Sequence, residues 1–105
     1  MDVLQRIAQI VEGNQVVLFM KGTRMFPQCG YSSRASAALY DVCKDAEFFD
    51  VFSDIEVYEN LPKYADWHTF PQLYINGELI GGCDILMELH GNGELKEMIN
   101  AAAQA

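Results

Sequence analysis

Hydrophobic residues recur along this chain with two periods, which together predict helices interleaved with short strands. Apolar residues at helical spacing over residues 3–11, with Asp2 as N-cap, predict a first helix. The unbroken apolar run of residues 16–20 is typical of a strand that is covered on both faces. Helical spacing returns after Gly30 and continues to Val42, which predicts a second helix.

The middle of the chain repeats this order of strand and helix. Residues 47–52 predict a second strand. Ser53 followed by Glu56 resembles a capping box and predicts a third helix that runs through Tyr64. Because the first two strands flank a helix, we expect them to be parallel neighbours joined by a right-handed crossover.

The last third of the chain opens with a hairpin signal. An Asn-Gly pair separates the short apolar runs 72–75 and 78–80, and this is the strongest local signal for a β-hairpin. Helices then fit residues 84–90 and 94–101. The pattern therefore predicts an α/β fold in one domain, residues 1–105, with a mixed sheet of four strands flanked by about five helices.

Composition limits the classes of protein that remain. Half of the residues are hydrophobic and 21% are charged, as in soluble globular domains. No apolar stretch approaches the ~20 residues that span a bilayer, and the N-terminus does not resemble a secretory signal. The net charge of −8 argues against a nucleic-acid partner. Three cysteines without a disulfide-framework spacing indicate a reducing compartment, so we expect a cytoplasmic protein that does not enter membranes.

The positive charge of the chain is concentrated around one thiol. Residues 13–40 contain no acidic residue, but they include Lys21, Arg24 and Arg34, which bracket Cys29. Such a neighbourhood favours a thiolate and attracts a small anion. The alternative is a chance fluctuation of charge on a solvated surface.

Cys29 lies between the first predicted strand and the second predicted helix. There, unpaired helix amides and the helix dipole stabilise a thiolate. A dithiol redox motif would carry its second cysteine three residues later, where this chain has Ser32. Cys29 therefore cannot close a disulfide within its own motif.

Several separated motifs resemble the monothiol glutaredoxins. They are Lys-Gly-Thr at 21–23, Pro-Gln-Cys-Gly-Tyr-Ser at 27–32, Trp67, Thr-Phe-Pro-Gln-Leu at 69–73 and Gly-Glu-Leu-Ile-Gly-Gly-Cys-Asp at 77–84. The signature of that family is Cys-Gly-Phe-Ser, and the resemblance runs over nearly the whole chain. It implies a thioredoxin-like fold.

The resemblance also implies a chemistry. Members of the family bind glutathione, and many hold a [2Fe–2S] cluster between two subunits, to which each subunit gives its active-site cysteine and each glutathione gives its thiol. They pass clusters to apo iron–sulfur proteins and often pair with BolA-like proteins. Two alternatives stay open. One is a glutathione-dependent thiol–disulfide oxidoreductase (deglutathionylation), and the other is a regulatory adaptor that reports iron status with a BolA-like partner.

The spacing of the cysteines agrees with a cluster shared by two chains. A [2Fe–2S] cluster needs four ligands, which are commonly thiolates. Cys29 and Cys43 lie near opposite ends of one predicted helix, roughly 20 Å apart at a rise of ~1.5 Å per residue. One accessible cysteine per chain therefore needs thiolates from outside, so we expect a homodimer that shares the cluster.

The resemblance assigns a glutathione site around Cys29, the catalytic thiol and cluster ligand. The residues at the family's glutathione-binding positions are Lys21, Tyr58, Phe70, Pro71, Gly82, Cys83 and Asp84. It implies that Lys21 pairs with the glycyl carboxylate, and that a cis bond before Pro71 leaves the Phe70 backbone free to pair with the cysteinyl unit. The positions from Gly82 to Asp84 hold the γ-glutamyl end, through amides at a helix start and the Asp84 carboxylate.

Four positions depart from the family pattern. Tyr58 replaces an arginine that helps to bind the glycyl carboxylate, and tyrosine cannot pair as a charged fork. Arg24, in place of a proline, is the candidate to compensate. Tyr31 replaces the signature phenylalanine, and its hydroxyl needs water or a partner. His68 replaces another proline.

Simpler interpretations remain for single residues. Lys21 taken alone is an ordinary solvated lysine, and Asp84 is also expected to be a helix N-cap. His68 and His90 have no catalytic or metal-binding partner at a suitable spacing and are interpreted as surface histidines. Trp67 and the phenylalanines other than the one at the site are interpreted as packing residues.

The other two cysteines receive different interpretations. Cys43 is interpreted as a buried helix residue. Cys83 lies close to the glutathione site by the resemblance, so an oxidative disulfide between Cys29 and Cys83 stays open.

Overall fold

The computed structural model describes residues 2–104 and contains the predicted order of helices and strands. Its elements are α1 (Val3–Gly13), β1 (Val16–Met20), α2 (Gly30–Val42), β2 (Glu47–Asp50), the 3₁₀ turn η1 (Val51–Ser53), α3 (Ile55–Ala65), β3 (Gln72–Ile75), β4 (Glu78–Gly81), α4 (Cys83–Gly91) and α5 (Glu94–Ala103). Asp2 caps α1 as predicted, because its side chain accepts a hydrogen bond from the Gln5 amide.

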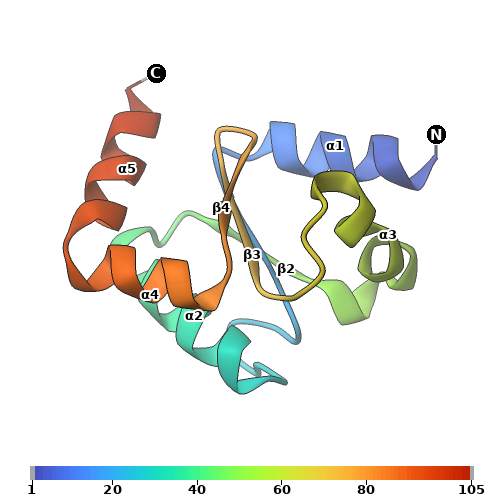
Figure 1. Ribbon diagram of the computed structural model, residues 1–105, viewed down its shortest axis with the longest axis horizontal. Helices are drawn as coiled ribbons and strands as arrows, with labels where there is room; N and C mark the ends of the chain where they lie inside the picture. Colours follow the sequence, from blue (N-terminus) through green and yellow to red (C-terminus); the bar gives the residue numbers. More distant parts are fainter. Residues whose placement is uncertain (1, 105) are drawn as a thin grey trace.

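The strands form one mixed sheet in the order β2-β1-β3-β4 (Figure 1). β1 is parallel to β2, as the crossover through α2 requires, and antiparallel to β3. β3 and β4 form the predicted hairpin, in which Asn76 and Gly77 both have positive φ angles of 49° and 82°. The thioredoxin-like α/β fold with a four-stranded mixed sheet and five helices is therefore confirmed.

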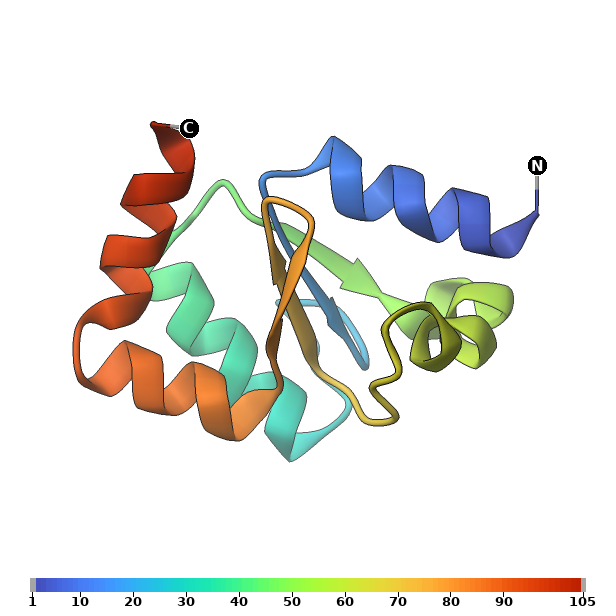
Figure 2. The same ribbon diagram turned by 45° about the horizontal axis from the view of Figure 1, so that its top comes forward.

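Helices cover both faces of the sheet, which explains the unbroken apolar run of β1. Figure 2 shows α2, α4 and α5 on one side and α1 and α3 on the other. Val16, Leu18 and Met20 pack in the cluster with α2, α4 and α5. Val17 and Phe19 point the opposite way and pack with α1 and α3. All five residues of β1 are buried as a result.

The second strand and the third helix differ from the prediction at their boundary. β2 ends at Asp50, because the Asp50 side chain accepts hydrogen bonds from the amides of Gly22 and Phe52 and turns the chain into η1. The N-cap of α3 is Asp54, which accepts from the Val57 amide at 3.3 Å, so the prediction of Ser53 as the cap was wrong.

A contact distant in sequence favours this cap. The Arg6 guanidinium of α1 lies 2.7 Å from the Asp54 carboxylate, and this hydrogen bond holds the pKa of that carboxyl below its usual range. The Ser53 hydroxyl bonds instead to the Asp50 carbonyl.

The last two helices are slightly longer than predicted. α4 begins at Cys83 with Gly82 as its N-cap, so Asp84 lies in the first turn and is not the cap.

Within residues 2–104, no helix has both the length and the apolar character needed to cross a membrane. At one end of the sheet, the end of β1 and the start of α2 meet the segment before β3 and the start of α4 (Figure 1).

Candidate functional site

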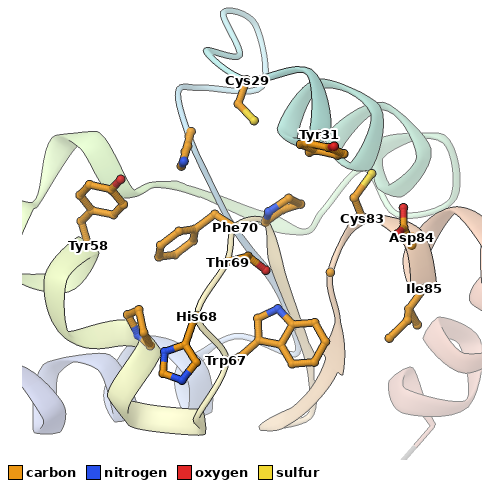
Figure 3. A pocket seen from close by; sticks show the side chains of 14 residues that line it. Cys29, Tyr31, Tyr58, Trp67, His68, Thr69, Phe70, Cys83, Asp84 and Ile85 are labelled. Atoms are coloured by element: carbon orange, nitrogen blue, oxygen red, sulfur yellow. The ribbon is translucent and has the colours of Figure 1, made fainter.

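A cavity of about 810 Å³ opens where these segments meet (Figure 3). The eight residues that the sequence placed at a site all line it, and they are Lys21, Cys29, Tyr58, Phe70, Pro71, Gly82, Cys83 and Asp84. They come from five separate parts of the chain, so the fold alone brings them together. The volume lies within the usual range of about 300–1,000 Å³ for small-molecule sites.

Cys29 is held at the N-cap of α2 by a contact between that helix and β1. Ser32, in the first turn of the helix, is fully buried, and its hydroxyl accepts a hydrogen bond of 3.0 Å from the Lys21 backbone amide. Lys21 directly follows β1. The serine that replaces a second cysteine therefore fixes the distance between the thiol and the end of the strand.

The surroundings of Cys29 favour its thiolate. The pKa of the thiol is lowered, chiefly by the Ser32 backbone N–H, which stabilises negative charge on the sulfur, against the opposing effect of partial burial. The Tyr31 amide, the Lys21 charge and the Ser32 hydroxyl lower the pKa further. The sulfur does not complete a capping hydrogen bond of good geometry. The direction of the shift nevertheless agrees with the prediction for a thiol at a helix N-terminus.

The other two cysteines lie in contrasting places, and all three are free thiols. Cys43 is the C-cap of α2, outside the cavity, and burial raises the pKa of its thiol. Cys43 packs against the hydrophobic core, as predicted, but it is only partly buried. Cys83 is buried in the first turn of α4, and Figure 3 shows its sulfur and that of Cys29 both pointing into the cavity.

The segment between α3 and β3 forms the wall opposite Cys29. α3 ends at Asp66, whose φ of 52° is left-handed, and the Phe70–Pro71 bond is cis as the resemblance implied. The Trp67 indole packs on Gly82, where a Cβ atom would lie 3.5 Å from the ring. Trp67 therefore packs, as predicted, but it also lines the cavity.

Tyr58 lines the cavity from α3 at the position where the family has an arginine. Its ring contacts Phe52 edge-on, at 5.5 Å between centroids, and Phe70 at 5.4 Å. Figure 3 shows it on the side of the cavity away from Cys83 and Asp84. The carboxylate-binding arginine is thus replaced by an aromatic ring that is held in place by packing.

The expected cluster of positive charge is only partly present at the cavity. Arg24 stacks on the Tyr40 ring, 3.9 Å from its centroid, and Arg34 lies 5.1 Å from the Tyr31 centroid. Among the described residues, Lys21 is the only lysine or arginine that lines the cavity. The structure therefore does not place Arg24 where it could replace the missing arginine.

Both histidines have carboxylate partners that the sequence did not indicate. His68 lines the cavity with a 74% exposed side chain, and its Nε2 lies 3.1 Å from Asp66. His90 of α4 lies 2.9 Å from Asp41 of α2, and neither residue lines the cavity. Both are surface histidines as predicted, and each contacts one carboxylate.

The sequence missed part of the cavity wall. The further lining residues are Tyr31, Pro62, Trp67, His68, Thr69 and Ile85. Thr69 and Ile85 directly adjoin predicted residues, and Trp67 and His68 belong to the run that leads to Phe70, so nearness in the chain was the available signal. The prediction that Phe26 is a packing residue was wrong, because its side chain, three residues before Cys29, is 76% exposed.

The cavity does not contain a complete set of metal ligands. Within residues 2–104, no group of three or more histidine, cysteine, aspartate or glutamate side chains is placed to hold a metal ion. The cavity offers the Cys29 thiolate, a second thiol at Cys83, one lysine, one carboxylate and the amides at the start of α4. This arrangement suits a small thiol-containing ligand that carries both positive and negative groups.

Comparisons with known proteins agree with this description. The family model for glutaredoxin matches residues 16–80. A ycf64-like monothiol glutaredoxin from Synechocystis sp. is 45% identical over 97 residues, which cover 92% of this chain and 91% of the relative.

Two solved structures extend the comparison to the fold. Reduced apo GrxS14 from poplar has a TM-score of 0.79 at 40% identity, covering 96% of this chain and 93% of that one. A glutaredoxin–glutathione complex from buckwheat has a TM-score of 0.81 at 28% identity, covering 95% and 89%.

Proposed function

This chain belongs to the glutaredoxin family as a monothiol member, and on that premise we propose that it binds glutathione and carries a [2Fe–2S] cluster between two copies of itself. The observation that carries the proposal is the position of Cys29. Its thiol has a lowered pKa and faces a cavity whose walls include Lys21 and the start of α4. No second cysteine lies in its motif, and the other thiol of the cavity, that of Cys83, is buried in the first turn of α4, so we expect a thiol from outside to complete the ligands.

The cavity suggests an orientation for glutathione. Its glycyl carboxylate pairs with Lys21, and its cysteinyl backbone pairs with the Phe70 backbone. Its γ-glutamyl carboxylate lies at the start of α4, where the N-cap Gly82 makes no side-chain cap and leaves the first amides available. The Asp84 carboxylate in that first turn then meets the ammonium group. The buckwheat complex supports glutathione as a ligand of a related cavity.

The donor set supports a shared cluster, which we regard as cargo. Four thiolates are needed, and one chain supplies a single thiolate-prone cysteine at the cavity. Two chains and two glutathione molecules complete the set. The chain's own residues hold the glutathione thiol beside Cys29, whose own pKa is lowered chiefly by the Ser32 amide. The recipients are then apo iron–sulfur proteins in a reducing compartment such as the cytoplasm, with a BolA-like protein as a further partner.

Anaerobic reconstitution tests this proposal. The protein is incubated with iron and sulfide, with or without reduced glutathione, and is then examined by visible absorption and size-exclusion chromatography. We expect a brown species of dimer size only when glutathione is present. A colourless protein in both samples contradicts the cluster, and a brown monomer contradicts the sharing.

A second function is favoured by the low pKa of Cys29 itself. As a deglutathionylating oxidoreductase, the Cys29 thiolate attacks the glutathione sulfur of a protein mixed disulfide and releases the protein thiolate. A second glutathione thiolate then attacks the glutathione bound to Cys29, giving glutathione disulfide and restoring the Cys29 thiolate. A colourless protein that turns over such a disulfide rapidly supports this function over the first.

Tyr58 provides a test of how firmly glutathione is held. Because Tyr58 lines the cavity where an arginine is usual, we expect Tyr58→Arg to tighten glutathione binding by about 1.4 kcal/mol or more, which is roughly tenfold, through a charge-assisted bond. Calorimetric titration measures the affinity, and loss of cluster colour at falling glutathione concentration measures the consequence. Arg24→Gln is the control, because Arg24 is stacked on Tyr40 outside the cavity and should leave the affinity unchanged. Unchanged binding by Tyr58→Arg contradicts the assignment.

A further inference from the structure

A buried amide lies behind the cavity wall. Gln72, the first residue of β3, has no exposed surface and is not among the residues that line the cavity. Its side-chain nitrogen donates to the carbonyl oxygens of Trp67, at 2.8 Å, and Thr69, at 3.2 Å. Its side-chain oxygen accepts from the Tyr74 hydroxyl at 3.0 Å. Both ends of the amide are therefore occupied.

The contacts fix which way this amide points. Burial raises the pKa of Tyr74 to about 12, so its hydroxyl keeps the proton that it donates. Turning the Gln72 amide over would place its oxygen against two carbonyl oxygens and leave both without a donor. The nitrogen of Gln72 must therefore face the segment that precedes β3, where it is the donor for two partly buried backbone carbonyls.

Holding those carbonyls also orients the N–H groups that follow them. In a planar trans peptide, the C=O and N–H bonds point in opposite directions. Because the Trp67 and Thr69 carbonyls turn inward to Gln72, the N–H groups of His68 and Phe70 turn away from it. Within the described residues 2–104, neither N–H donates to another backbone group, and both residues line the cavity.

We propose that Gln72 is a positioning residue for ligand binding in the cavity. By holding two carbonyls, it aims the N–H groups of His68 and Phe70 outward as donors to the oxygens of bound glutathione. This inference rests on the proposed function, since it takes glutathione as the ligand. It adds that the affinity for glutathione is set in part by a side chain that never touches it.

Two substitutions separate positioning from simple support of the core. Gln72→Met keeps the length of the side chain but removes both of its donors, so the two carbonyls lose their partner. Tyr74→Phe removes only the hydrogen bond on the far side of the amide and leaves the donors in place. Both variants should lose stability in urea unfolding, because each breaks a buried hydrogen bond.

Binding and fluorescence should distinguish the variants. In calorimetric titration, we expect Gln72→Met to weaken the affinity for reduced glutathione by about tenfold or more, as for one or two lost hydrogen bonds. Tyr74→Phe should change the same affinity by less than about twofold. Trp67 is the only tryptophan in the chain, so its emission reports on the segment directly. In ligand-free protein, the emission should shift to longer wavelength in Gln72→Met alone.

The outcomes separate this inference from the proposed function. A wild-type protein that does not bind glutathione overturns the proposed function. A wild type that binds, together with a Gln72→Met variant that binds equally well or no worse than Tyr74→Phe, overturns the inference alone. If Gln72→Met does not fold, amide hydrogen exchange on the wild type decides. The amides of His68 and Phe70 should exchange rapidly without glutathione and slowly with it, and rapid exchange in both states overturns the inference.

Discussion

The two ends of helix α2 each carry a cysteine, and the two thiols have opposite properties. Cys29 is the N-cap and Cys43 is the C-cap of the same helix. The pKa of Cys29 is lowered, chiefly by the Ser32 amide, whereas burial raises the pKa of Cys43. One end opens on the cavity, and the other packs against the cluster beneath α4 and α5.

The difference shows that the balance between amide donors and burial sets the pKa of each thiol in this helix. At the N-terminal end, the Ser32 and Tyr31 amides stabilise negative charge on the Cys29 sulfur and outweigh the effect of burial. At the C-terminal end, the Asp45 and Ala46 amides also lower the pKa of Cys43, but burial outweighs them. The side chains near each end add to the contrast, because Lys21 lowers the pKa of Cys29 and Asp45 raises that of Cys43.

The largest expected effect comes from removing each thiol in turn. Cys29→Ser should abolish cluster colour in anaerobic reconstitution, because the chain then offers no thiolate at the helix N-terminus. Cys43→Ser should retain the colour, because Cys43 lies outside the cavity. Absorption spectra of the two variants, prepared side by side, measure this. Equal loss in both variants contradicts the functional difference between the ends.

The next effect concerns the contact that ties the N-terminal end to the sheet. Ser32→Ala leaves the Lys21 amide without its acceptor, which should lower the free energy of unfolding by about 1–3 kcal/mol. Ser33→Ala, at the exposed neighbouring position, is the matched control and should change it little. Urea denaturation measures both, and similar values for the two variants indicate that the contact is not important.

The two thiols should also react differently with pH. Because the pKa of Cys29 is lowered and that of Cys43 is raised, alkylation by iodoacetamide should label Cys29 at lower pH and at a higher rate. Mass spectrometry of the two peptides over a pH series gives each profile in the same sample. Profiles that coincide show that the helix ends do not control the thiols.

The smallest effect lies near the C-terminal end, at the pair formed by Asp41 and His90. The His90 hydrogen bond lowers the pKa of Asp41 in the folded state. A carboxyl with a lowered folded pKa stabilises above its unfolded value of about 3.9, and the contribution disappears as the pH falls through the folded pKa. The difference in unfolding free energy between wild type and Asp41→Asn should therefore shrink toward acid pH. It should be small throughout, because the pair is exposed to solvent.

The fold was predictable where local sequence determines it. The apolar run of β1 indicated burial on both faces, and the Asn-Gly pair indicated the hairpin, because each signal depends on residues next to one another. The start of α3 was not predictable, since Ser53 and Asp54 are both good caps and only Arg6, distant in sequence, favours the second.

The site was predictable in its residues but not in its charges. The resemblance located eight lining residues, while the orientation of Arg24 and Arg34 depends on aromatic rings that no local pattern reveals. The role of Gln72 was also hidden. Its position after the cis proline belongs to a recognisable motif, but its contacts appear only when the preceding segment folds back over β3.

The absence of Arg24 and Arg34 from the cavity lining has a consequence for the rate at which an anion binds. The chain carries a net charge of −8, and Lys21 is the only lysine or arginine among the described residues that line the cavity. A glutathione anion therefore approaches against long-range repulsion and is attracted only within the last few ångströms. Because salt screens charges beyond roughly 8 Å at physiological ionic strength, added salt should speed the encounter while weakening the final contact with Lys21. The rate of glutathione binding should therefore rise with ionic strength, while the affinity falls.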